Sequence, residues 1–142
     1  SANKKTNKKI LTENKDDQFW EKINKQDLRW NKIMKDFIIQ DLGLEEKVFI
    51  NYSNIKKSFS NDKNEMFQDF RSFMNKQKGE NYEYDPSKDE IYFEKMLKKK
   101  YLMRLKSLFG RNNYNKYLRL LERENLKLEK RAKGESFVSI EL

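Results

Sequence analysis

The residues that carry most enzyme chemistry are missing from this chain. Its 142 residues include no His and no Cys. This excludes a Ser-His-Asp triad, a Cys nucleophile, haem or iron–sulfur ligation and an ordinary zinc site. Only carboxylates, Lys, Tyr and the Ser and Thr hydroxyls remain for acid–base or nucleophilic work. Without Cys, the chain can form no disulfide either.

Two pairs of neighbouring acids, Glu45/Glu46 and Asp89/Glu90, come nearest to a catalytic dyad. Neighbours in sequence diverge on a helix, and both pairs fall where we expect a helix to start, where acids favour the helix dipole. A general acid or base also needs a pocket that shifts its pKa. The four glycines stand alone and form no phosphate-binding loop. We therefore expect no enzyme, no catalytic residue, no metal and no cofactor.

The basic residues are more informative, because they are unevenly distributed. Lys and Arg total 32 against 23 Asp and Glu, a net charge of +9. Residues 95–133 alone hold 14 basic and three acidic residues, whereas residues 16–94 hold 13 and 17. Such cations can cover apolar surface with their methylenes and bind anionic partners with their heads. The predicted binding residues are Lys95, Lys98, Lys99, Arg104, Lys106, Arg119, Arg123 and Lys127. The alternative is a solvated face that pairs with the acidic part of the chain.

Long helices are the elements that must position these cations. One Pro and four Gly provide few turns, so the composition predicts an all-α fold. Apolar residues recur at helical steps over 16–41, and further stripes follow over about 44–79, 87–109 and 112–134. We expect four helices that form antiparallel hairpins or a small bundle. A helix with one apolar face must bury it in such a bundle or across a homodimer interface.

Local signals set the expected helix ends. Gly43 and Gly110 are expected at the C′ positions of the first and third helices. The stretch 87–90, Ser-Lys-Asp-Glu, matches a capping box at the start of the third helix. Either Asn112 or Asn113 is expected to cap the fourth.

The chain outside these helices divides into an arm, a linker and a tail. Residues 1–15 hold five Lys and no apolar period, which indicates a mobile basic arm. Residues 16–142 are expected to form a single helical domain, with a linker at 79–86 that contains the one Pro. The tail 135–142 alternates apolar and polar residues, and without a partner strand we expect it to dock as an extended segment.

The aromatic residues on the helical stripes are expected in the core. Trp20 and Trp30 lie near one face of the first helix, and a partner-binding anchor is the alternative for them. Tyr101, Tyr114 and Tyr117 fall on apolar stripes, so we expect core residues rather than stacking platforms for bases.

Two segments, which cover about a third of the chain, carry a resemblance to a known family: DLGLEEKVFINYSNIKKSF at 41–59 and KKKYLMRLKSLFGRNNYNKYLRLLEREN at 98–125. They resemble an acidic helix start and a later hairpin with a glycine turn in the Spy-like family of small, all-helical periplasmic bacterial proteins. The family's Thr-x-x-Gln signature is replaced here by Leu-Glu-Glu-Lys at 44–47. The resemblance implies a thin, curved helical hairpin, often dimeric, whose basic concave face holds unfolded or envelope-stress-related clients without ATP.

We therefore expect a non-enzymatic binding protein that presents a basic and apolar helical surface to a protein client or another acidic partner. The resemblance implies an extracytoplasmic chaperone or envelope-stress helper. The alternative is a basic helical module that binds nucleic acid, since a basic stretch with interleaved Tyr has the required electrostatics. No run of about 18 apolar residues occurs, so we expect no membrane span. The start at Ser1 instead of Met favours a processed, periplasmic or otherwise exported protein, with a cytoplasmic location also open.

Overall fold

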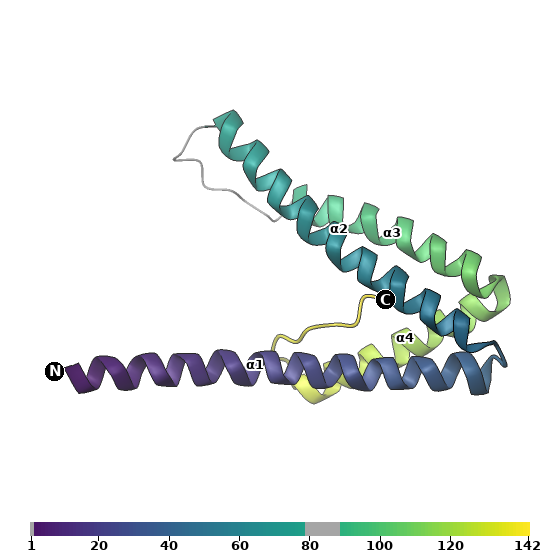
Figure 1. Ribbon diagram of the computed structural model, residues 1–142, viewed down its shortest axis with the longest axis horizontal. Helices are drawn as coiled ribbons and strands as arrows, with labels where there is room; N and C mark the ends of the chain where they lie inside the picture. Colours follow the sequence, from purple (N-terminus) through teal and green to yellow (C-terminus); the bar gives the residue numbers. More distant parts are fainter. Residues whose placement is uncertain (1, 79–88) are drawn as a thin grey trace. The chain divides into compact units, whose positions relative to one another are not determined.

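The computed structural model describes residues 2–78 and 89–142, of which residues 2–15, 73–75, 77 and 78 are described by their backbone alone. The described chain is all-α, with four helices and an extended C-terminal segment (Figure 1). It forms two compact units, Ser1–Leu44 and Glu45–Leu142. The predicted linker at 79–86 lies outside the described residues, and so does the first half of the predicted capping box at 87–90. The predicted domain bounds stay a prediction.

The first unit is one long helix. α1 spans Ala2–Asp36 and continues into a π-helical turn, η1, at Phe37–Asp41. Gly43 follows with φ of +67°, so the predicted stop is confirmed. The predicted helix start near residue 16 is wrong, because the helical backbone begins at Ala2. A formed helix needs no new nucleus to extend, so the basic N-terminal segment continues it without an apolar period of its own.

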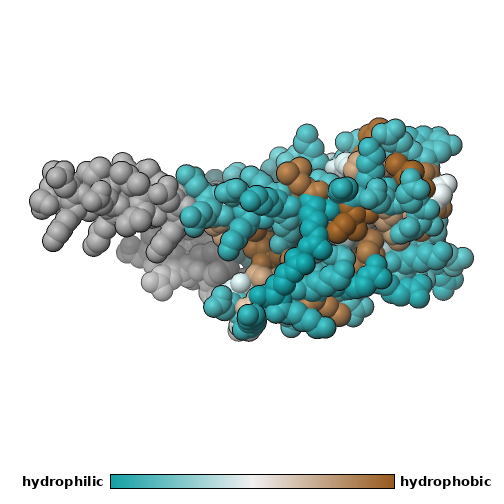
Figure 2. Space-filling model, turned by 90° about the horizontal axis from the view of Figure 1, so that it is seen from below, coloured by the Kyte–Doolittle hydropathy of each residue, from teal (hydrophilic) through white to brown (hydrophobic). Residues whose placement is uncertain are grey.

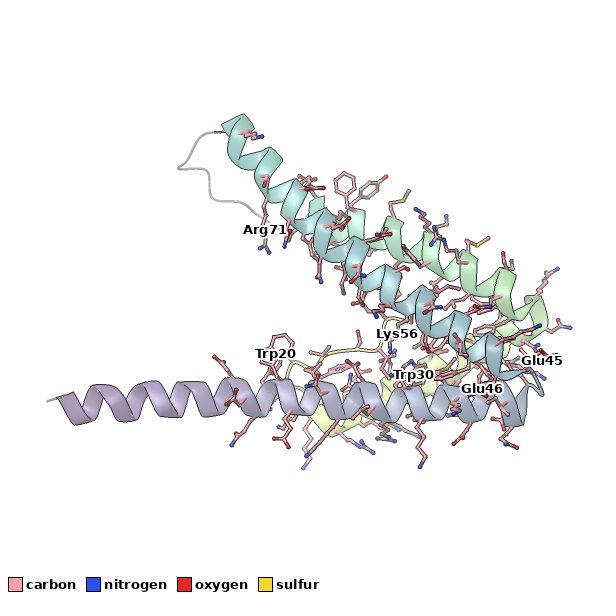
Figure 3. The ribbon with its side chains drawn as sticks, in the orientation of Figure 1. Trp20, Trp30, Glu45, Glu46, Lys56 and Arg71 are labelled. Carbon is pink, nitrogen blue, oxygen red and sulfur yellow. The ribbon has the colours of Figure 1, made fainter. Side chains whose placement is uncertain are left out.

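The apolar stripe of this first unit is buried only in its C-terminal half. Trp30 and Met34 are buried, and so are Phe37 and Ile38. Trp20, in contrast, is 61% exposed (Figure 3). The core prediction is therefore confirmed for Trp30 and wrong for Trp20.

The second unit contains α2 (Glu46–Lys78), α3 (Asp89–Phe109), α4 (Arg111–Ala132) and an extended tail. α2 and α3 lie side by side and antiparallel, and α4 contacts α3 after a sharp turn of the chain (Figure 1). The hairpin predicted from the apolar stripes is thus confirmed within this unit. Among the described residues, no helix is both long and apolar enough to cross a membrane.

Aromatic and leucine side chains form the core of the second unit. The Tyr52 ring lies 6.2 Å from the Phe109 ring and 6.5 Å from the Tyr117 ring, measured between centroids. Large rings that pack edge-on or offset in this way stabilise the contact beyond their buried area. The buried apolar residues are Tyr52 and Phe59 from α2, Tyr101, Leu105 and Phe109 from α3, Tyr117, Leu120 and Leu121 from α4, and Leu142 from the tail.

A single residue, Gly110, makes the turn between α3 and α4. Its φ of +84° is open to glycine and strained for other residues. Its N–H donates to the Lys106 carbonyl (2.9 Å) and its carbonyl accepts from the Tyr114 N–H (2.8 Å). Gly110 therefore ends α3 as predicted and also occupies the N-cap position of α4. The predicted Asn cap is wrong, because Asn113 already lies inside α4, where its side chain donates to the Phe109 carbonyl (3.1 Å).

Candidate binding surface

α4 carries a row of cations on a face that points away from the core. Arg119, Arg123 and Lys127 follow one another at four-residue steps, so they lie above one another along the helix. Burial of an apolar face fixes the rotation of such a helix and leaves its other face to solvent. The buried face of α4 holds Tyr117, Leu120, Leu121 and Glu124.

Two open hollows follow this row and share Leu126 and Lys130. The first has a volume of about 350 Å³ and is lined by Arg119, Glu122, Arg123, Leu126, Lys127 and Lys130. The second has a volume of about 540 Å³ and is lined by Leu126, Glu129, Lys130, Lys133, Gly134, Glu135 and Phe137. Because they share lining residues, we call the two hollows together the α4 groove.

The α4 groove contains apolar side chains that are open to solvent. Leu126 is 48% exposed and Phe137 is 41% exposed. Exposed apolar carbon that is surrounded by charged heads suits a partner that is itself both charged and apolar. Figure 2 shows one face of the molecule, on which hydrophobic side chains lie among hydrophilic ones.

The charge of the α4 groove is positive but mixed. Five of its lining residues are Lys or Arg and three are Glu. Lys127 Nζ lies 3.0 Å from Glu124 Oε1, so this cation is partly neutralised by its own helix. Within the part of the chain that the structure describes, no ion pair engages Arg119, Arg123 or Lys130. These three cations are therefore available to an anionic partner.

Two of the cations predicted on α3 lie in a different setting. Lys95 and Lys98 line a hollow of about 250 Å³, together with Ile91, Glu94, Ser139 and Glu141. Burial, and then the neighbouring Glu141 carboxylate, raise the pKa of Glu94 above its ordinary value. Since this lining carries two cations and two acids, it attracts anions less than the α4 groove does.

The remaining predicted cations of α3 line neither hollow. The Arg104 guanidinium lies 4.6 Å from the centroid of the Tyr101 ring, within the range of a cation–π contact. Lys99 is exposed and Lys106 is half-buried. The structure thus brings Arg119, Arg123 and Lys127 together and places the five α3 residues apart from them.

The tyrosines interleaved with these cations serve the core. Tyr101 is buried and its hydroxyl donates to Asp62, and burial followed by this hydrogen bond raises the pKa of Tyr101. Tyr117 is buried too, and burial raises its pKa. Tyr114 is half-buried. The core prediction is therefore confirmed for Tyr101 and Tyr117, which cannot stack on a base from these positions.

The two pairs of adjacent acids lie where α2 and α3 begin. Glu45 and Glu46 are both exposed where α2 starts (Figure 3). Glu90 Oε1 lies 3.6 Å from Arg71 Nε, an ion pair between α3 and α2. Acidic side chains of the described residues do not gather in groups of three that could hold a metal ion.

Sequence reasoning missed the apolar members of the α4 groove. Leu126 lies outside the apolar stripe of α4, and its position directly before Lys127 and three residues after Arg123 was an available signal. Phe137 offered no such signal, because only the path of the tail brings it to this helix. No protein-family model, no curated protein and no solved structure matches the chain, so the Spy-like resemblance stays a prediction.

Proposed function

We propose that this chain is a non-enzymatic binding protein whose α4 groove holds unfolded protein segments that are both acidic and apolar. One observation carries the proposal: exposed Leu126 and Phe137 lie in one groove with unpaired cations. The cations attract acidic chain over a distance of about 8 Å at physiological salt. The apolar side chains then bury carbon of the partner.

Several properties of the groove suit a holding role better than a tight, specific complex. The hollows are open and their acids, such as Glu122 and Glu129, break the positive charge into short stretches. Such a surface supports many weak contacts that a client can exchange. A chaperone-like role in an extracytoplasmic, periplasmic setting belongs to the same proposal, and the Spy-like resemblance supports it.

Nucleic acid fits the groove less well. Tyr101 and Tyr117 are buried, so they supply no stacking surface. Three glutamates line the groove and would lie against phosphates. A duplex gains nothing from Leu126, whereas an unfolded protein does. This difference makes the two functions separable by experiment.

The test uses reduced, carboxymethylated α-lactalbumin as an unfolded acidic client and a 20-base-pair duplex as the rival ligand. The full chain is compared with the variants Arg119→Glu/Arg123→Glu and Leu126→Ser. We expect the double charge reversal to weaken client binding at least tenfold, which is about 1.4 kcal/mol. We expect Leu126→Ser to weaken client binding by about threefold and to leave any duplex binding unchanged.

A matched control separates the groove from overall charge. Lys57→Glu/Lys76→Glu makes the same change in net charge on exposed residues of α2. It should reduce client affinity less than twofold at 150 mM salt, because these charges lie outside the groove. Equal losses in both double variants, or duplex binding with a steep salt dependence and no client binding, would overturn the proposal.

A further inference from the structure

The last three residues of the described tail are held like a bound peptide. The tail runs extended after α4 (Figure 1) and no strand pairs with it in the described chain. The Asn125 side chain makes two hydrogen bonds with the main chain of Ile140. Its Nδ2 donates to the Ile140 carbonyl (2.9 Å), and its Oδ1 accepts from the Ile140 N–H (2.8 Å). Such a paired contact recognises an extended backbone regardless of its side chain.

Residues 141 and 142 are recognised by other groups. Lys63 Nζ lies 2.6 Å from Glu141 Oε1, so a cation of α2 forms an ion pair with the acidic side chain at this position. The Tyr52 hydroxyl donates to the Leu142 main-chain oxygen (2.9 Å), and the Tyr117 hydroxyl donates to the same oxygen. The Leu142 side chain is 1% exposed. The contacts therefore select an aliphatic residue after an acidic one.

The chain between α4 and these residues is a short tether. Phe137, Val138 and Ser139 are exposed, and Gly134 bends the chain with φ of +86°. A tether of this length holds its end at an effective concentration in the millimolar range. Residues 140–142 belong to no helix, so the docked segment can leave without breaking a backbone hydrogen bond of a helix.

From this geometry we infer that Tyr52, Lys63, Tyr117 and Asn125 form a peptide-acceptor site for an extended aliphatic–acidic–aliphatic segment. The chain's own Ile140-Glu141-Leu142 fills the site in cis, and a partner protein that carries such a segment binds when the tail is displaced. None of the four acceptor residues lines the α4 groove, so the inference does not rest on the proposed function.

The test measures binding of a fluorescein-labelled peptide, SFVSIEL, which copies residues 136–142. The full-length variant Ile140→Pro removes the N–H that Asn125 accepts and so weakens the competing tail. We expect this variant to bind the peptide at least tenfold more tightly than the unaltered chain does. Adding Asn125→Ala to it should remove that gain, and the control peptide SFVSPEL should not bind. Equal affinity of the peptide for the unaltered and Ile140→Pro chains, or no binding to a folded Ile140→Pro chain, would overturn the inference.

A second measurement needs no destabilised tail. The chain has no Cys, so Ser139→Cys gives one labelling site on the exposed tether. Unlabelled SFVSIEL at millimolar concentration should release the tail and lower the fluorescence anisotropy of the label, whereas SFVSPEL should not. Unchanged anisotropy would contradict the inference even if Ile140→Pro failed to fold. Arg119→Glu/Arg123→Glu should leave peptide binding intact, which distinguishes failure here from failure of the proposed function.

Discussion

Removing both tyrosine hydroxyls that reach Leu142 should destabilise the chain by more than the two single substitutions combined. Tyr52 and Tyr117 are each 0% exposed, and both hydroxyls donate to the same main-chain oxygen. An oxygen with two lone pairs keeps one donor after either Tyr→Phe change. Each single variant therefore loses one hydrogen bond, which costs about 1 kcal/mol.

The double variant leaves that buried oxygen with neither tyrosine donor. It loses about 2 kcal/mol from the two hydrogen bonds and a further 1–3 kcal/mol, roughly, from the desolvated oxygen. We expect a total loss of about 3–5 kcal/mol and a coupling of at least about 1 kcal/mol between Tyr52 and Tyr117.

Urea unfolding followed by circular dichroism at 222 nm measures these values. Both tryptophans lie in the first unit, so their fluorescence would follow the wrong part of the chain. Tyr101→Phe with Tyr117→Phe is the control pair, because the Tyr101 hydroxyl donates to Asp62 and shares no acceptor with Tyr117. Control effects should add within about 0.5 kcal/mol. If the losses in unfolding free energy of Tyr52→Phe and Tyr117→Phe were also additive, the reasoning that both hydroxyls share one acceptor would be refuted.

Two further predictions concern the turn and the carboxyl pair. Gly110→Ala should lower the free energy of unfolding by about 1–3 kcal/mol, measured in urea, because φ of +84° is strained for alanine although a Cβ would meet open space. Burial and Glu141 raise the pKa of Glu94, so the folded state binds its proton more tightly and loses stability as pH rises from about 4.5 through the raised pKa. Glu94→Gln should remove this loss and raise the free energy of unfolding at pH 7 by up to about 1 kcal/mol. Glu65→Gln, at an exposed position of α2, is the control and should do neither. Identical profiles of unfolding free energy against pH for Glu94→Gln and the unaltered chain would contradict the assignment.

The helices could be predicted from the sequence because their signals are local. Apolar residues at steps of three and four define α2, α3 and α4, and a lone glycine at 43 or 110 marks where a helix must end. Errors occurred where a local signal is ambiguous. Asn112 and Asn113 are good N-cap residues, but a one-residue turn leaves the cap position to Gly110.

The helical spacing of an apolar stripe did not predict which of its side chains are buried. Trp20 and Trp30 satisfy the same helical spacing, yet one is exposed and the other buried. Spacing says which residues share a face and nothing about how far a neighbour covers that face. The eight predicted cations illustrate the same limit, because composition identified them and only the fold separated those of α4 from those of α3.

The sequence by itself determined an all-α chain, the absence of His and Cys chemistry, and a strongly basic second half. Tertiary structure alone decided which distant residues meet. It brought Phe137 to the α4 groove, Lys63 to Glu141 and Tyr52 to Leu142, the last across 90 positions of the chain. The physical reason is that helix formation depends on neighbours within four residues, whereas a docked tail depends on side chains that only the packed helices place together.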